Sequence, residues 1–102
     1  MKKMKIMQVN FKYVITYDEL MKAFDDAAPA FAAVPGLVWK LWLSDKEKSM
    51  AAGIYYFKDN VDLDKHLASD LHKSLFTHPA IEDLDVKIFD VMDVSNKTNA
   101  PL

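Results

Sequence analysis

The chain has 102 residues, of which 51% are hydrophobic and 27% charged, and these values are typical of one small globular domain. All 13 basic residues are lysine and the net charge is −2, so neither arginine side chains nor excess positive charge favours a nucleic-acid partner. The sequence has no cysteine, which excludes disulfides, thiolate nucleophiles and thiolate metal sites.

The N-terminal segment MKKMKIMQVNFKYV is basic and then apolar, as a secretion signal would be. Polar residues interrupt its apolar positions, however, and no small-residue cleavage site follows. No stretch approaches the roughly 20 consecutive apolar residues that a membrane helix needs. We therefore expect a cytoplasmic protein that does not bind a membrane.

Residues 5–14 alternate between apolar and polar side chains, which predicts a first strand. Thr16 and Glu19 then have the spacing of a helix capping box, and apolar residues follow at helical intervals. A first helix is therefore expected from about Tyr17 to about Ala33. Pro29 lies inside it and lacks a backbone donor, so it should kink or divide the helix.

Two apolar strands are predicted next, at 37–43 and 51–57, with a charged turn between them. Side chains alternate along a strand, so one side of the first strand carries Leu37, Trp39, Leu41 and Leu43, and the other carries Val38, Lys40 and Trp42. In the second strand, Gly53, Tyr55 and Phe57 oppose Ala52, Ile54 and Tyr56. Neither strand has a polar face, so both faces of this hairpin must be covered.

Asp59 and Asn60 are expected to cap a second helix, in which leucines recur every four residues from Leu63 to Leu75. His78-Pro79 would end this helix. A short connection, with one helical turn at 80–84, should lead to a fourth strand at 86–94. The polar residues 95–102 are interpreted as a C-terminal tail, which leaves residues 1–94 as a single domain.

The predicted order βαββαβ indicates an α+β fold of the ferredoxin-like kind, with a four-stranded antiparallel sheet and both helices on one face. That arrangement leaves the other sheet face uncovered although it is rich in bulky apolar residues. A second copy of the sheet would cover it. We therefore expect a homodimer in which two sheets pack into a barrel.

Three segments carry a family resemblance, namely PGLVWKLW at 35–42, AAGIYYF at 51–57 and KIFDV at 87–91. With them the chain resembles the YdhR-type mono-oxygenases of the dimeric α+β barrel superfamily, from the first strand to about Val94. The resemblance implies a dimer and a cavity between helices and sheet in each subunit. It also implies an activity, the oxygenation of small aromatic compounds by O₂ with no metal, flavin or haem cofactor.

The best candidate for a catalytic base is His72, which shares a helical stripe with Phe76 and matches a histidine of that family. The alternative is a half-buried histidine bonded to a backbone carbonyl. His66 lies four residues from an aspartate on either side, which indicates a solvated acidic face. His78, before a proline, is interpreted as a turn residue.

Asn10, a polar residue in mid-strand, and Tyr55 are candidates to orient a substrate beside His72, although Asn10 also suits a structural role. Aromatic side chains would line the cavity or, alternatively, fill the core or an interface; they are Trp39, Trp42, Tyr56, Phe57 and Phe76. Lys40 is expected to reach the rim, with a charge for a substrate phenolate as the alternative. Asp90 needs a partner, for which Lys40 or Lys87 would serve.

Two other functions fit the same fold. A non-catalytic barrel would bind a small apolar ligand in the same cavity without a titrating group inside it. Haem binding would need an axial histidine and a wide pocket. Related haem-degrading barrels use an Asn–Trp–His set, of which Asn10 and His72 match two members. Phe57 occupies the position of the tryptophan, which argues against haem degradation.

Overall fold

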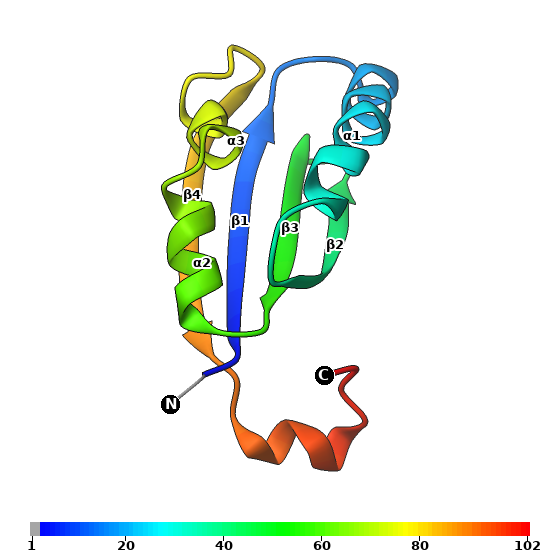
Figure 1. Cartoon of the computed structure of the whole chain (residues 1–102). Helices are drawn as coiled ribbons and strands as arrows, with labels where there is room; N and C mark the ends of the chain where they lie inside the picture. The colour runs from blue at the N-terminus through cyan, green and yellow to red at the C-terminus, as the bar shows by residue number, and fades with distance from the viewer. Residues whose placement is uncertain (1–2) are drawn as a thin grey trace.

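A four-stranded antiparallel sheet forms the frame of the computed structural model, which describes residues 3–102 (Figure 1). The strands lie in the order β2-β3-β1-β4, as the ferredoxin-like arrangement requires. The elements in chain order are β1 (Lys5–Tyr13), α1 (Tyr17–Ala32), β2 (Leu37–Asp45), β3 (Met50–Phe57), α2 (Asn60–Leu67), α3 (Asp70–Lys73) and β4 (Ile81–Asp90). Two 3-10 helices follow α3 and β4, at Ser74–Phe76 and Asp93–Thr98.

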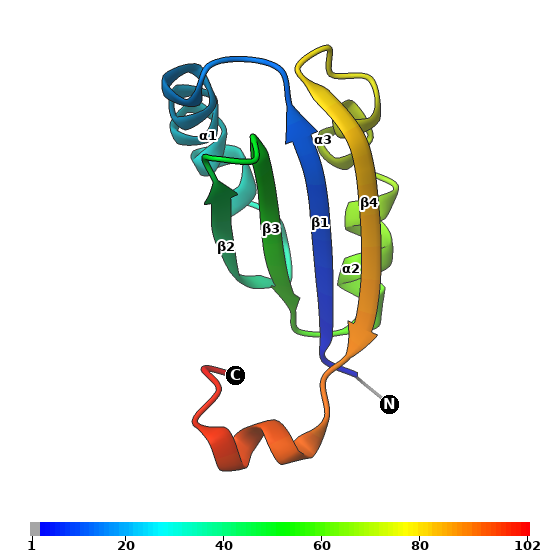
Figure 2. The same ribbon diagram turned by 180° about the vertical axis from the view of Figure 1, so that it is seen from behind.

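All three α-helices lie on one face of the sheet, and the opposite face is open, as Figure 2 shows. Helix α1 lies over β2 and β3, whereas α2 and α3 lie over β1 and β4. The βαββαβ order and the placement of the helices on one face confirm the predicted fold. The buried core is formed on the helix-covered face by Met7, Val9, Phe11, Tyr55 and Phe57, together with Leu20, Phe31 and Leu63 from the helices.

The strand register decides which side chain reaches which face. Trp42 pairs with Gly53, and Lys40 pairs with Tyr55, so these residues share the helix-covered face. A register shift between Leu37 and Trp39 changes the predicted alternation at the start of β2. Leu37 pairs with Phe57 and packs against the core, which the regular alternation of the sequence did not anticipate.

Helix α1 has the predicted capping box, because Thr16 accepts from the Glu19 backbone N–H and the Glu19 side chain accepts from that of Thr16. Pro29 was expected to kink or divide this helix, and the second of these alternatives is wrong, since α1 continues as one helix to Ala32. Pro29 lies in the last turn, so only one backbone bond near the helix end is lost.

The predicted second helix is wrong in its continuity. It is divided into α2 and α3, and the boundary is Ser69, whose backbone is extended at φ −75° and ψ 154°. The Ser69 hydroxyl accepts from the His72 backbone N–H at 3.2 Å and donates to the His66 carbonyl at 2.6 Å. These bonds offer the chain an alternative to continuous helix, as serine often does.

The C-terminal part also differs from the prediction. Strand β4 begins at Ile81, where a helical turn was expected, and it ends at Asp90. The segment after it turns back below the sheet (Figure 2), and the Trp39 indole Nε1–H donates to the Pro101 carbonyl at 2.9 Å. Within residues 3–102, no helix is long and apolar enough to cross a membrane.

The Ser69 cap gives a first testable prediction. Ser69→Ala should lower the free energy of unfolding by about 1 kcal/mol, because the N-terminus of α3 loses its side-chain acceptor. Ser69→Thr keeps the hydroxyl and should stay near the wild type. Urea unfolding followed by circular dichroism measures both, and an equal loss in the two variants would contradict a capping role.

Candidate active site

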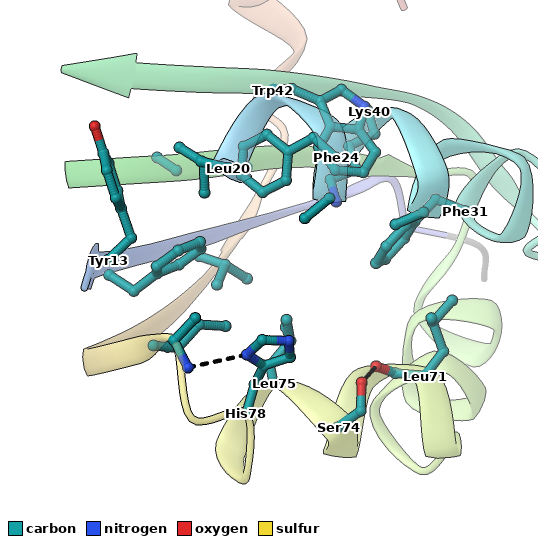
Figure 3. A pocket seen from close by; sticks show the side chains of 18 of the residues that line it. Tyr13, Leu20, Phe24, Phe31, Lys40, Trp42, Leu71, Ser74, Leu75 and His78 are labelled. Atoms are coloured by element: carbon teal, nitrogen blue, oxygen red, sulfur yellow. Dashed lines mark hydrogen bonds between the residues drawn. The ribbon is translucent and has the colours of Figure 1, made fainter. Parts of the chain in front are cut away.

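A cavity of about 170 Å³ lies between the sheet and the helices (Figure 3). Leu20, Phe24 and Phe31 line it from α1, and Lys40, Trp42 and Tyr55 from the sheet. The opposite wall comes from the segment that contains α3 and the turn after it, with Leu71, Leu75 and His78. An engineered cavity of about 150 Å³ with apolar walls binds benzene, so this space suits a small aromatic molecule.

The Lys40 ammonium lies among aromatic rings at this cavity. Its Nζ is 3.4 Å from the centroid of the Trp42 ring and 3.5 Å from that of Phe31. The Tyr55 ring centroid is 4.5 Å away. Cation–π contacts of this kind contribute about 0.5–2 kcal/mol each. The expectation that Lys40 reaches to the rim is therefore wrong, because its charged end is held inside by three rings.

Burial lowers the pKa of Lys40 from its ordinary value of 10.5 to about 7. The salt bridges among residues 3–102 involve other lysines, so no carboxylate in this part of the chain offsets the burial of Lys40. Asp90, for which Lys40 was one candidate partner, pairs with Lys5 instead. Lys40 therefore gives the cavity an amine that changes protonation near neutral pH.

Gly53 makes room for the ends of two cavity side chains. A Cβ atom at Gly53 would lie 3.0 Å from the Tyr55 ring and 3.2 Å from Cε of Lys40. Tyr55 is 2% exposed, and burial raises the pKa of its hydroxyl, so the hydroxyl keeps its proton and serves as a donor. Tyr55 thus lines the cavity and presents a donor there.

His78 also lines the cavity, although the sequence indicated only a turn residue. Its Nδ1 accepts from the Ala80 backbone N–H at 3.1 Å, which Figure 3 shows as a dashed line. Because Nδ1 is the acceptor in this bond, a neutral imidazole carries its proton on Nε2. His78 therefore offers a second donor at the wall opposite the sheet.

His66 and His72 form a buried pair beside the cavity. The two imidazoles are 3% and 4% exposed, and their ring centroids are 5.3 Å apart. The predicted solvated face for His66 is wrong, because its ring lies on the core side of α2 against Tyr55, with 5.7 Å between ring centroids. Burial lowers the pKa of His72, and burial with the nearby charges of His72 and Lys40 lowers that of His66 to about 4. Both rings are therefore neutral at neutral pH.

His72 and two predicted cavity aromatics lie behind the cavity wall. Neither His72 nor Phe57 nor Phe76 is among the residues that line the cavity. The Phe57 ring is fully buried against His66, with 5.4 Å between ring centroids. Phe76 is 60% exposed and covers the other side of His72. The structure therefore does not place His72 in position to act on a molecule in this cavity.

Three predicted site residues lie on the open face. Asn10 pairs with Ala52 in the sheet and accepts from the Gln8 side chain at 3.3 Å. Trp39 and Tyr56 pair across β2 and β3 on the same side, with ring centroids 5.4 Å apart. Since Tyr55 faces the helices, Asn10 is separated from it by the sheet. The predicted grouping of Asn10, Trp39 and Tyr56 around one cavity with Tyr55 is therefore wrong.

The family described as "Putative mono-oxygenase ydhR" matches residues 6–101, nearly the whole chain. The chain belongs to this family. No curated protein matches it. The ydhR resemblance carried by the segments around Trp39, Tyr55 and Phe89 is thereby confirmed.

Solved structures agree in fold. SnoaB, a cofactor-independent oxygenase from Streptomyces nogalater, is 18% identical, with 89% of this chain and 95% of that chain covered and a TM-score of 0.72. A structure described as a "putative antibiotic biosynthesis monooxygenase" from Caulobacter crescentus CB15 is 19% identical, with 90% of this chain and 92% of that chain covered and a TM-score of 0.70.

A hydroxynitrile lyase from Passiflora edulis is as similar in fold, with a TM-score of 0.71, 13% identity, and 91% of this chain and 97% of that chain covered. The lyase and the oxygenase share one fold, although they are described as enzymes of different reactions. At these identities the likeness establishes the fold, and the reaction must be argued from the site.

The sequence contained a signal for only part of this site. Lys40 lies between two tryptophans in a strand, which is an unusual setting for a charge. This setting indicated, as the less favoured alternative, that Lys40 provides a charge for a substrate phenolate. His78 gave no such signal, because its contact with the cavity depends on the turn before β4. Among residues 3–102, no three carboxylate or imidazole side chains gather as a protein metal site would need.

The pKa of Lys40 gives a second prediction. In the unfolded chain Lys40 titrates near 10.5, and in the folded chain near 7. Between these values the unfolded state binds more protons, so stability must rise with pH. The free energy of unfolding should increase by about 2 kcal/mol more in the wild type than in Lys40→Met from pH 7 to about pH 9. Urea unfolding at both pH values measures this, and equal increases would exclude a buried amine.

Proposed function

We propose that the protein is a cofactor-independent mono-oxygenase that acts on small phenolic aromatic compounds in the cavity beside Lys40. The observation that carries this proposal is the Lys40 amine inside an apolar cavity, 3.4 Å and 3.5 Å from two ring centroids. Membership of the ydhR family and the likeness to a cofactor-independent oxygenase support it.

Lys40 takes the role of the base in this mechanism, in place of His72. Its pKa of about 7 leaves a substantial fraction of neutral amine at neutral pH. This amine accepts the proton of a bound phenol, and the ammonium that forms then pairs with the phenolate. The apolar walls strengthen that ion pair because they exclude water.

The phenolate supplies the electrons that O₂ needs. With a dihydroxynaphthalene, one ring C–H becomes C=O, the phenol becomes the second carbonyl of a quinone, and the substrate loses four electrons in total. O₂ accepts the four electrons: one oxygen atom enters the product, and the other leaves as water with the two hydrogens. The atoms and electrons balance without an external reductant.

Tyr55 and His78 orient the substrate. Tyr55 keeps its proton, because burial raises its pKa, and can donate to a substrate oxygen from the sheet side. His78 lines the opposite wall with its Nδ1 already engaged by the Ala80 N–H. Phe24 and Trp42, with ring centroids 4.9 Å apart, provide an aromatic surface for the substrate ring.

A test compares O₂ uptake with a dihydroxynaphthalene in the wild type and in Lys40→Arg. Arginine keeps the positive charge and does not act as a base, so kcat/KM should fall about 100-fold or more. In the wild type, kcat/KM should rise with pH and level off above about 7, where the amine is neutral.

Lys46→Met is the matched control, because Lys46 also lies over a ring, that of Tyr17 at 5.1 Å, but outside this cavity. It should keep the wild-type rate. Binding of the dihydroxynaphthalene without O₂ uptake would contradict the mono-oxygenase proposal and favour the non-catalytic barrel.

We also propose that a second copy of the chain covers the open face of the sheet. Leu41 and Phe89 are 51% and 52% exposed there, and Ile54 lies on the same face. Exposed apolar side chains that gather on one face usually mark an interface. Burying each of them would stabilise a dimer by about 1.5–3 kcal/mol at most.

Leu41→Lys should convert the wild-type dimer to a monomer, since it places a charge in the interface. Val61→Lys is the control, because Val61 is similarly exposed, at 56%, but lies on α2 at the other side of the molecule. Size-exclusion chromatography with light scattering measures the mass. A monomeric wild type, or a dimer in both variants, would contradict the proposed interface.

A further inference from the structure

We propose that Lys40 is also a carbonyl-binding residue, whose amine forms a reversible imine with small aromatic aldehydes that enter the cavity. This activity uses the same cavity as the proposed oxygenation but needs no O₂ and no phenolate. The two proposals can therefore fail independently.

The first argument is the position of the amine. Lys40 is the lysine that lines this cavity among residues 3–102, and the cavity volume of about 170 Å³ suits one aromatic ring with a short substituent. Its Nζ lies over three ring faces and takes part in no salt bridge with this part of the chain. An aromatic aldehyde seated on the apolar walls would thus bring its carbonyl to an amine that no carboxylate holds.

The second argument is the state of that amine. Imine formation needs a neutral amine, and lysines gain this reactivity when they lie in an apolar pocket. Burial lowers the pKa of Lys40 to about 7, so about half of the molecules carry the neutral amine at pH 7. An exposed lysine with an ordinary pKa near 10.4 is neutral in fewer than about 1 in 1,000 molecules at that pH. Lys40 should therefore react before the surface lysines.

The reaction balances without a redox partner. Lys40 Nζ adds to the carbonyl carbon, so an N–C bond forms and the C=O double bond becomes a C–O single bond. Loss of water then breaks that C–O bond and forms C=N, and both hydrogens of the neutral amine leave with the oxygen. The protonated Tyr55 hydroxyl lines the same cavity and can donate to the departing oxygen.

Gly53 leaves space beside the end of the Lys40 side chain. A Cβ atom at this position would be 3.2 Å from Lys40 Cε, which is tighter than a comfortable contact. Gly53→Ala should therefore reduce imine formation while it leaves all 13 lysines in the chain. It complements Lys40→Met, which removes the amine altogether.

The experiment incubates the wild-type protein with a low concentration of ortho-hydroxybenzaldehyde at pH 7 and traps imines with cyanoborohydride. Intact mass and peptide mapping then give the number and position of hydroxybenzyl groups. Among the lysine side chains we expect one group per chain, on Lys40, at least 10-fold ahead of Lys46, which lies over a ring outside the cavity. Naphthalene, which has no carbonyl, should protect Lys40 by occupying the cavity.

Equal labelling of Lys40 and Lys46, or labelling of Lys40 that naphthalene does not reduce, would overturn the proposal. The wild-type map decides this even if Lys40→Met folds poorly. Labelling of Lys40 without O₂ uptake would support carbonyl binding and contradict the oxygenase. O₂ uptake without labelling of Lys40 would support the oxygenase and contradict carbonyl binding.

Discussion

The alternation of side chains along β2 and β3 is the constraint on which the site depends. Helices cover one face of the sheet only, so each residue of these strands lies either in the core or on the open face. This alternation places Lys40, Trp42 and Tyr55 together under the helices and leaves Trp39 and Tyr56 outside. A shift of one residue would exchange the two sets and remove the amine from the cavity.

Lys40 lies between two opposing effects of similar size. Removal of an ammonium from water costs several kcal/mol, whereas contact with each ring face stabilises the charged form by about 0.5–2 kcal/mol. Three rings contact Lys40, so neither the charged nor the neutral amine is strongly excluded. This balance explains how a charged residue occupies an apolar cavity.

The architecture could be predicted from the sequence, and the site only in part. The alternation in β1, the capping box at Thr16 and the two apolar strands specify the fold through local patterns. The break at Ser69 had no comparable signal, because the leucine repeat continues through it from Leu67 to Leu71. The burial of His66 was missed for another reason: its two aspartate neighbours indicated a solvated face, although it lies three residues after the buried Leu63 on the same side of α2. Lys40 and Tyr55 could be named as candidate site residues from the sequence. Which face of the sheet meets the helices could not be predicted, because both faces of the hairpin are apolar.

The division of the second helix has a further consequence for how molecules exchange with the cavity. The wall opposite the sheet consists of α3, with four residues, and a 3-10 turn of three residues. Helical pieces this short have little stability of their own, whereas the neighbouring strands of eight to ten residues share continuous ladders. Local unfolding therefore requires less free energy in this wall than in the sheet. We infer that ligands enter and leave when the wall opens, and that amide hydrogens of α3 exchange with solvent sooner than those of β1.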